Sequence, residues 1–344
     1  MTRRRGRASK ARTFWALIAC AAGSVAVSGY GAAAHAAATN TAWTCPSAPF
    51  GNPVPSGAAI TRLPDALPND AYNNYGTLDA NVEGPVWRNG SLYVSEFGGG
   101  PNPEQSRIVK ITNGIGTVFN ATAGTNGLAV GPAGALYGAS QTAGGIVRFA
   151  GPSDPAAVVA GKFLGQRFNS PNDLTIRNDG TIYFTDPTYQ APQPAPQART
   201  RVYRVAPQTH AVSVIDDNKV QPNGITLSPD EKSLYLATTN GLYKYAVAAN
   251  GSVGTAVRFA SQVPAGDGMA VDCAGNLYVA DTNVVVVAPG GRTIAQLRMP
   301  AGGETVTNVA FGGSDHRTLF ITAMGPGNAR GVYQVKLKVP GLPY

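Results

Sequence analysis

The sequence predicts an all-β fold, a six-bladed β-propeller, on the evidence of a repeated phrase and of the composition. The phrase opens with a polar residue, continues with apolar residues and, after a turn, ends in an apolar–aromatic–apolar run. Its six copies begin at Glu83, Asn126, Asn172, Asn223, Asp267 and Thr307, between 40 and 51 residues apart. Short strands that recur every 40–50 residues or so are typical of propeller blades. A charged fraction of only 13% and 42 glycines agree with this fold class.

Residues 1–36 are expected to be a secretory signal peptide. Six basic residues and no acid lie within residues 1–13, small apolar residues fill 14–31, and Ala34-His35-Ala36 fits a cleavage site. A membrane anchor is the alternative, and so is a lipoprotein at Cys20. The Ala- and Gly-rich apolar segment and the short run before Cys20 argue against both. We therefore expect a secreted or periplasmic protein that is not held in a membrane once the signal is removed.

The charge of the chain belongs mainly to this N-terminal segment. Without residues 1–36, Lys+Arg falls from 27 to 21 while Asp+Glu stays at 19, so the net charge falls from +8 to +2. No basic run remains that would indicate a nucleic-acid partner. We expect a monomer that acts on a small molecule.

Residues 37–58 form a small, polar, Pro-containing arm that carries Cys45. Cys273 is the other cysteine left after cleavage, and an even pair in an exported protein favours a disulfide between them. Two separate buried thiols are the alternative. Neither cysteine has a Cys or His neighbour at the spacing of a zinc site.

Residues 59–344 are expected to form the propeller domain, with four strands in each repeat. In the first repeat, alternation and turn residues predict strands near 84–88, 91–96, 106–112 and 116–120. The last repeat has only three, near 308–311, 318–322 and 331–337. Residues 59–63 precede the first repeat and are available as the missing strand. An N-terminal strand would then close the last blade and remove a free sheet edge.

Two unusual loops follow the second strands of their repeats, at 98–106 and 187–200. The first contains Gly-Gly-Gly-Pro-Asn-Pro, and the second is rich in Pro, Gln and Ala. Antiparallel strands reverse direction, so both loops lie on the face where the first strands begin. They are either plain surface linkers or the rim of a substrate site.

The residues that open the six phrases all carry a side-chain oxygen. The blade symmetry brings these six positions together around one axis. Two carboxylates among amide oxygens suit a hard divalent cation, Ca²⁺ first and then Mg²⁺ or Mn²⁺. Asn-Gly and Asp-Gly are also ordinary turn residues, which is the simpler interpretation of each position alone. Glu83 favours the cation site, because glutamate is a poor turn former.

Four blocks of the sequence resemble the signature motifs of the senescence marker protein/gluconolactonase family. They are Glu83-Gly-Pro-Val-Trp, Ser170-Pro-Asn-Asp-Leu, Gln221-Pro-Asn-Gly-Ile-Thr-Leu and Gly266-Asp-Gly-Met-Ala-Val. The resemblance covers about residues 81–335. It implies a six-bladed propeller with one divalent cation on the axis, Ca²⁺ before Mg²⁺, Mn²⁺ or Zn²⁺, and a lactonase activity.

The resemblance also implies roles for individual residues. The implied metal ligands are Glu83, Asn172, Asn223 and Asp267. Asn172 binds the metal in some members and the substrate in others. Asp267 is the implied general base, and Asp173 would orient a ligand or a water. A metal-bound carboxylate is a weak base, so Asp173 and Asp186 remain alternatives. Asn126, Asn172 and Asp186 are the expected substrate contacts.

The sequence therefore predicts a secreted, metal-dependent lactonase that opens a lactone or ester by attack of water on a metal-polarised carbonyl. One alternative is a non-catalytic binding propeller whose axial metal only stabilises the blades. Another is a metal-dependent phosphotriesterase or arylesterase. Ala270 and Ala310 stand where the fluorophosphatase branch has ligands for a second calcium. No Gly-x-Ser-x-Gly motif indicates a serine esterase. His210 and His316 are expected in solvated turns away from the axis.

Overall fold

The computed structural model describes residues 43–47, 49–70, 81–98, 106–300 and 303–342. All of them belong to the structural unit that spans Asn40–Tyr344. The expected signal peptide, the first residues of the arm and most of the 98–106 loop lie outside the described residues.

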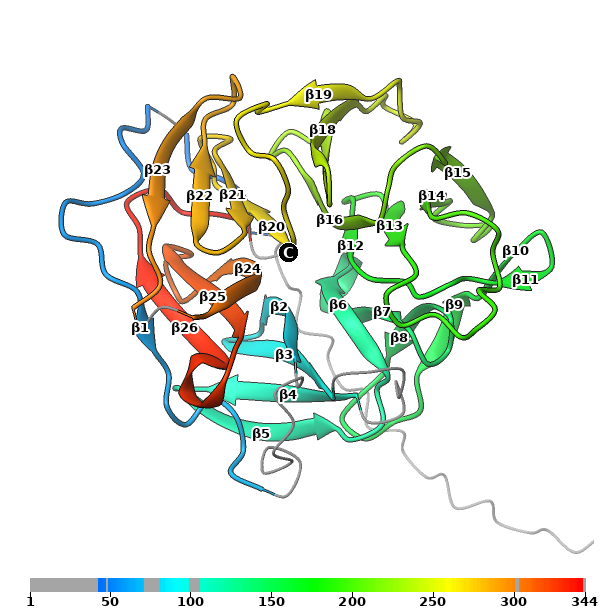
Figure 1. Cartoon of the computed structure of the whole chain (residues 1–344), viewed down its shortest axis with the longest axis horizontal. Coiled ribbons are helices and arrows are strands. Elements are labelled where there is room, and N and C mark those ends of the chain that lie inside the picture. The colour runs from blue at the N-terminus through cyan, green and yellow to red at the C-terminus, as the bar shows by residue number, and fades with distance from the viewer. Residues whose placement is uncertain (1–42, 48, 71–80, 99–105, 301–302, 343–344) are drawn as a thin grey trace, which may run out of the picture. The chain divides into compact units, whose positions relative to one another are not determined.

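Six four-stranded antiparallel sheets are arranged in a ring as the blades of a β-propeller (Figure 1). The first three blades consist of β2 (Asn81–Arg88), β3 (Ser91–Phe97), β4 (Arg107–Thr112) and β5 (Ile115–Asn120); β6 (Thr125–Val130), β7 (Leu136–Ser140), β8 (Gly145–Phe149) and β9 (Ala157–Ala160); and β12 (Leu174–Ile176), β13 (Ile182–Asp186), β14 (Arg201–Val205) and β15 (Val212–Asp216). The expected strands of the first repeat are confirmed to within a few residues.

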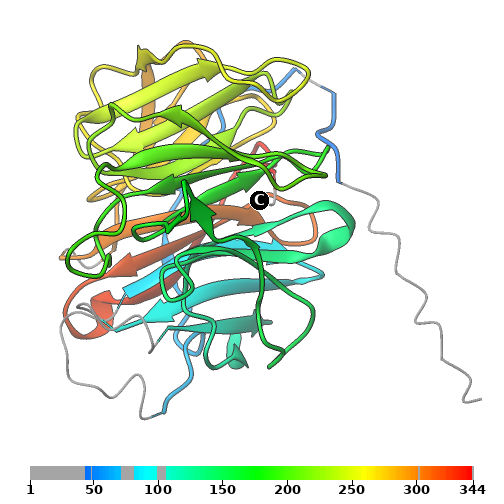
Figure 2. The same cartoon turned by 90° about the vertical axis from the view of Figure 1, so that its right-hand side faces the viewer.

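The next three blades complete the ring. They consist of β16 (Pro222–Leu227), β17 (Ser233–Thr238), β18 (Gly241–Ala246) and β19 (Val257–Phe259); β20 (Met269–Val271), β21 (Leu277–Ala280), β22 (Val284–Val287) and β23 (Thr293–Leu297); and β24 (Thr305–Gly312), β25 (Thr318–Met324), β26 (Gly331–Lys336) and β1 (Thr61–Arg62). A hairpin of β10 (Lys162–Phe163) and β11 (Gln166–Arg167) lies outside the blades, and two 3₁₀ turns cover Pro132–Gly134 and Gly327–Ala329. Seen from the side, the blade strands run between the two faces of the ring (Figure 2).

The N-terminal strand closes the last blade, as the sequence predicts. Strand β1 pairs antiparallel with β26, with Thr61 opposite Gln334 and Arg62 opposite Tyr333. The backbone N–H of Leu63 then donates to the carbonyl of Val332 at 2.9 Å. The two ends of the propeller chain therefore share one sheet, and the outer edge of β26 is covered.

The hydrophobic core lies between neighbouring blades, because each inner strand presents alternate apolar residues to the next sheet. Between the fifth and sixth blades, Tyr278 packs edge-on against Phe311, with ring centroids 5.1 Å apart. The phenol O–H of Tyr278 donates to the Asp272 carboxylate at 3.0 Å. Buried aromatic rings thus fill the wedge between blades while their polar atoms remain hydrogen-bonded.

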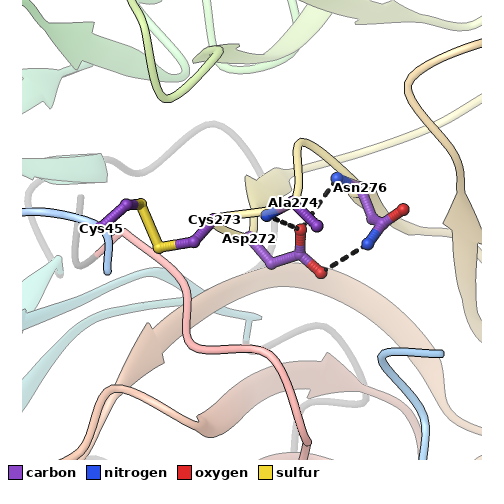
Figure 3. The surroundings of a disulfide bond; sticks show 5 residues. All are labelled: Cys45, Asp272, Cys273, Ala274 and Asn276. Carbon is purple, nitrogen blue, oxygen red and sulfur yellow. Dashed lines mark hydrogen bonds between the residues drawn. A yellow bond between two sulfur atoms is a disulfide. The ribbon is translucent and has the colours of Figure 1, made fainter. Parts of the chain in front are cut away.

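A disulfide joins Cys45 to Cys273, as expected from the cysteine count, with the two Cα atoms 5.4 Å apart. Figure 3 shows that Cys273 lies in the turn between β20 and β21. The Asp272 carboxylate holds this turn by accepting hydrogen bonds from the backbone N–H groups of Ala274 and Asn276, each at 2.9 Å. The disulfide therefore attaches the N-terminal arm to a rigid turn in the fifth blade.

We predict that the double substitution Cys45→Ser/Cys273→Ser lowers the free energy of unfolding by about 2–4 kcal/mol. The two cysteines are 228 residues apart, and the chain-entropy model assigns about 4–5 kcal/mol to closing so long a loop. Urea unfolding followed by tryptophan fluorescence measures the difference. Because both thiols are removed, mispaired disulfides do not obscure the result, and equal stability of the two proteins would contradict the prediction.

Candidate functional site: an acidic cluster at the end of the propeller axis

The innermost strands approach one another closely where the phrases begin. In four blades the second residue of the phrase is glycine, at Gly84, Gly127, Gly224 and Gly268. A Cβ atom on any of these would overlap the neighbouring inner strand. Direct backbone hydrogen bonds join adjacent phrases, from the Gly127 N–H to the Asn172 carbonyl at 2.7 Å and from the Gly268 N–H to the Thr307 carbonyl at 2.8 Å. Glycine is required here because the backbones are in contact.

In the other two blades the residue at this second position has a side chain. Each of these side chains lies against the glycine of a neighbouring phrase. Asp173 occupies the position in the third blade and Asn308 in the sixth. A Cβ atom on Gly127 would be 2.5 Å from Asp173 Oδ1, and one on Gly268 would overlap the Asn308 amide. The two glycines thus provide the space that the carboxylate and the amide fill.

Asn308 is a site residue that the repeat pattern does not identify. Its amide hydrogen-bonds to the carboxylates of Glu83 and Asp173, which offsets part of the rise in pKa that burial causes in both. The pattern indicates Thr307 instead, but the Thr307 hydroxyl donates to the Val82 carbonyl at 2.5 Å and contacts the Thr322 hydroxyl at 2.9 Å. A β-bulge lies beside it, between Val306 and Asn308, as it does at the same position of the first, second and fourth blades. One signal could have identified Asn308. Like Asp173, it is the second residue of its phrase, a position that is glycine in the other four blades.

Three carboxylates lie together at this end of the axis, and of these Glu83 and Asp173 are buried and Asp267 is half-buried. Burial, followed by the charge of Asp173, raises the pKa of Glu83 to about 8, and burial raises the pKa of Asp173 to about 7. Burial and the charges of Glu83 and Asp173 raise the pKa of Asp267 well above its ordinary value. Among the described residues, no lysine or arginine forms an ion pair with any of the three. The cluster therefore lacks a positive partner from the described part of the protein, and burial favours the protonated form of its carboxyls.

The composition of the cluster fits a hard divalent cation. Carboxylate and amide oxygens from Glu83, Asn172, Asn223 and Asp267 are the ligand types that Ca²⁺ and Mg²⁺ prefer. Within the described part of the chain, no three His, Cys, Asp or Glu side chains form a metal-binding group by themselves. A cation at this site would therefore depend on the asparagine amides as well as on the carboxylates.

Asn223 connects the cluster to the rim of the site. Its side chain hydrogen-bonds to Asp267 and to the phenol of Tyr189. Tyr189 lies in the 187–200 loop, and burial together with the charge of Asp267 raises the pKa of its phenol to about 12. Its side chain is nevertheless 41% exposed. The contact favours the interpretation of this loop as a rim, and Tyr189 is a second site residue that the sequence pattern did not single out.

Asp173 and Asp186 are held by backbone hydrogen bonds. Asp173 Oδ1 accepts from the Leu174 N–H at 2.9 Å and Oδ2 from the Ile225 N–H at 3.2 Å, which ties β12 to β16. Asp186 is 0% exposed, and its two oxygens accept from the N–H groups of Asn169 and Ser170 at 3.0 and 2.8 Å. Burial raises the pKa of Asp186 to about 7. Asp186 therefore fixes the segment that leads into Asn172.

The remaining candidates differ in exposure. Asn126 is buried at the start of β6, and no hydrogen bond joins its side chain to another described residue. Asp267 is half-buried, whereas Glu83, Asp173 and Asp186 are buried. Solvent therefore reaches Asp267 more readily than the other three carboxylates.

Neither histidine of the described region contributes to this cluster. His210 is exposed in a turn, as expected. His316 also lies in a turn, but it is half-buried and stacks on Trp43, with ring centroids 4.2 Å apart. The expectation of a solvated ring is wrong for His316, because the arm attached through Cys45 covers it.

The fold and this cluster of acidic and amide side chains define a propeller with an acidic axial site. The family model described as the SMP-30/gluconolactonase/LRE-like region matches residues 82–325, and the chain belongs to this family. No helix in the described part of the chain is long and apolar enough to cross a membrane.

Several known proteins are similar to this chain. A gluconolactonase from Zymomonas mobilis is 32% identical over 219 residues, which are 58% of this chain and 61% of that protein. The alignment thus spans less than two thirds of that relative. The structure of a Xanthomonas campestris gluconolactonase is 27% identical with a TM-score of 0.68, covering 86% of this chain and 100% of that one. A calcium-binding regucalcin from Agrobacterium tumefaciens, at 19% identity and a TM-score of 0.62, shares the fold.

We predict that the chelated protein loses stability as the pH rises from about 4 to about 8. The unfolded carboxyls titrate near pH 4, whereas the folded pKa values are about 8 for Glu83 and about 7 for Asp173. Between these limits the folded state binds more protons, so the free energy of unfolding falls with pH. Urea unfolding in EDTA at several pH values measures the slope.

Glu83→Gln provides the control for this prediction. It removes one titrating carboxyl from the cluster, so the chelated variant should lose less stability over the same range. The pKa of His316 is lowered by burial, which gives an opposite slope that is common to both proteins. Identical slopes for the two proteins would show that Glu83 does not titrate abnormally.

Proposed function

We propose that the protein is a secreted lactonase that depends on one divalent cation, with Ca²⁺ as the first candidate. The observation that carries the proposal is the cluster of Glu83, Asp173 and Asp267, which has no positive partner among the described residues, in a chain of the gluconolactonase family. Carboxylates with strongly shifted pKa values are common in catalytic and metal-binding sites. Similarity to gluconolactonases supports a lactone as the substrate class.

In this proposal, Glu83, Asn172, Asn223 and Asp267 hold the cation. When bound, the cation polarises the lactone carbonyl and stabilises the charge that develops on its oxygen. Negative charge on Glu83 and Asp267 then has a positive partner, which offsets their burial. Asn126 and Asn172 are proposed to contact the substrate, and Tyr189 lies where the rim would meet it.

Asp267 is the proposed general base. It is half-buried, so a water can reach it, whereas both oxygens of Asp173 and of Asp186 accept backbone hydrogen bonds. Asp267 takes a proton as the water oxygen bonds to the acyl carbon. The acyl carbon–oxygen bond of the ring then breaks, and the leaving oxygen takes up the proton to yield a hydroxy acid. Asp173 and Asp186 act as positioning residues.

Secretion is supported by two features. The N-terminal segment has the composition of a signal peptide. The Cys45–Cys273 disulfide is typical of oxidising compartments. Together they favour an extracellular or periplasmic enzyme.

We predict that the purified protein binds one divalent cation per chain. The oxygen ligands and the uncompensated carboxylates should retain Ca²⁺ through dialysis, and plasma mass spectrometry measures the content. Glu83→Gln removes a ligand charge and should lower the affinity, while Asp315→Asn, on an exposed turn ion-paired to Lys336, should not. A folded protein that holds less than about 0.2 ion per chain after Ca²⁺ loading would contradict the cation site.

We predict that Asp267→Asn and Glu83→Gln differ at saturating metal. Both remove a negative charge from the cation and weaken its binding. Asp267→Asn should stay at least about 100-fold below the wild-type kcat, because it also removes the proposed base. Glu83→Gln should recover part of the rate once the site is filled. A pH-stat assay with a panel of lactones measures both.

The outcome separates the remaining candidate functions. Equal recovery of both variants would make Asp267 a ligand only and return the base to Asp173 or Asp186. A metal-loaded protein that hydrolyses no lactone or aryl ester would indicate a binding propeller with a structural cation. Activity on a phosphotriester but not on lactones would favour the phosphotriesterase alternative.

A further inference from the structure

A pocket lies at the other end of the inner strands, far from the acidic cluster. Glu83 is near the start of β2 and Arg88 is at its end, so five residues of extended chain, about 16 Å, separate them. The pocket has a volume of about 450 Å³, within the range of small-molecule sites. We call it the distal pocket; its wall includes Trp43, Trp87, Arg88, Asn178, Pro229 and His316.

Aromatic rings form one side of the distal pocket. Trp43 stacks on His316 with ring centroids 4.2 Å apart and planes inclined by 22°. Trp87 stacks on Phe320 with centroids 5.5 Å apart and planes inclined by 10°. Both indoles are half-buried. Rings that are already held by a stacked neighbour offer flat faces to a planar ligand at little cost in conformational entropy.

One positive charge in the wall is not neutralised. Arg177 is ion-paired with Asp179 at 2.8 Å and with Glu231 at 3.3 Å. Arg88 donates through Nε to the Gly134 carbonyl at 2.6 Å, and its guanidinium lies 5.7 Å from the Tyr93 ring centroid. Among the described residues, neither terminal nitrogen of Arg88 has a hydrogen-bond partner. The guanidinium is thus held in place with its two outer N–H groups available, the arrangement that binds a carboxylate in a bidentate manner.

The polar atoms of the pocket favour an aromatic acid over a sugar acid. No Asp or Glu lines it, so the many hydroxyl donors of a sugar would find few strong acceptors. The buried Nδ1 of His316 has no hydrogen-bond partner within the described region. This nitrogen can therefore form a hydrogen bond with one polar group of a ligand or with a water molecule.

We propose that the distal pocket binds a small aromatic carboxylate, with the ring against Trp43 and Trp87 and the carboxylate on Arg88. The disulfide to Cys273 holds Cys45, and with it the arm that carries Trp43, as one wall of the pocket. This site does not depend on the proposed lactonase activity, because it shares no residue with the acidic cluster.

The chain supplies its own reporter for the test. It has three tryptophans, Trp15, Trp43 and Trp87, and the latter two line the distal pocket. In a full-length Trp15→Phe background, tryptophan fluorescence therefore reports this pocket and not the acidic cluster. The probes are benzoate, benzamide as the uncharged analogue, and gluconate as a sugar acid.

We expect benzoate to change the fluorescence in a saturable manner and benzamide to bind about tenfold more weakly, because it lacks the charge-assisted pair with Arg88. Arg88→Gln should weaken benzoate binding by about tenfold, whereas Arg148→Gln, an exposed arginine on β8, should leave it unchanged. Circular dichroism checks that each variant is folded. Should Arg88→Gln not fold, Trp43→Phe on the arm replaces it and is expected to weaken benzoate binding as well.

Three results would overturn the proposal. The first is the absence of saturable binding by benzoate. The second is an equal effect of Arg88→Gln and Arg148→Gln, which would remove the carboxylate contact. The third is gluconate binding as tightly as benzoate, which would make the pocket a sugar-acid site.

Discussion

Contact between the backbones of the inner strands is the constraint on which the rest of the structure depends. Gly84, Gly127, Gly224 and Gly268 have no side chain because the next blade occupies that space. The hydrogen bonds from Gly127 to Asn172 and from Gly268 to Thr307 then link one blade to the next at the axis. Any side chain at these glycines would push the blades apart, so the same residues that close the ring also set the size of the site.

The acidic cluster follows from this constraint. Because the strands meet so closely, the side chains that precede the glycines have little room, and burial raises the pKa values of Glu83 and Asp267. The two exceptions to glycine, Asp173 and Asn308, fill the space that Gly127 and Gly268 leave. Asn308 donates to two of the carboxylates, but an amide cannot neutralise three of them. The proposed cation would supply the missing positive charge.

The repeat predicts those parts of the molecule that symmetry determines. The blades, the strand from 59–63 that closes the ring, and the convergence of Glu83 with Asp267 all follow from equal positions in successive phrases. The disulfide was predicted because two cysteines, Cys45 and Cys273, remain after the expected cleavage. The repeat does not identify Asn308, because it indicates the first residue of each phrase, whereas Asn308 is the second residue, which is glycine in four of the six blades. Tyr189 and the cover over His316 come from a loop and an arm, whose positions depend on contacts between distant segments that no local pattern records.

The two ends of an inner strand have different surroundings, and β2 is an example. Its first residues lie against neighbouring backbones, where only glycine and a few polar side chains fit. Its last residues, Trp87 and Arg88, line the distal pocket, and the Trp87 indole lies over Gly312 of β24, where a Cβ atom would overlap it. The acidic end and the aromatic, cationic end of β2 thus both depend on glycines of neighbouring inner strands, Gly127 and Gly268 around the cluster and Gly312 beneath Trp87.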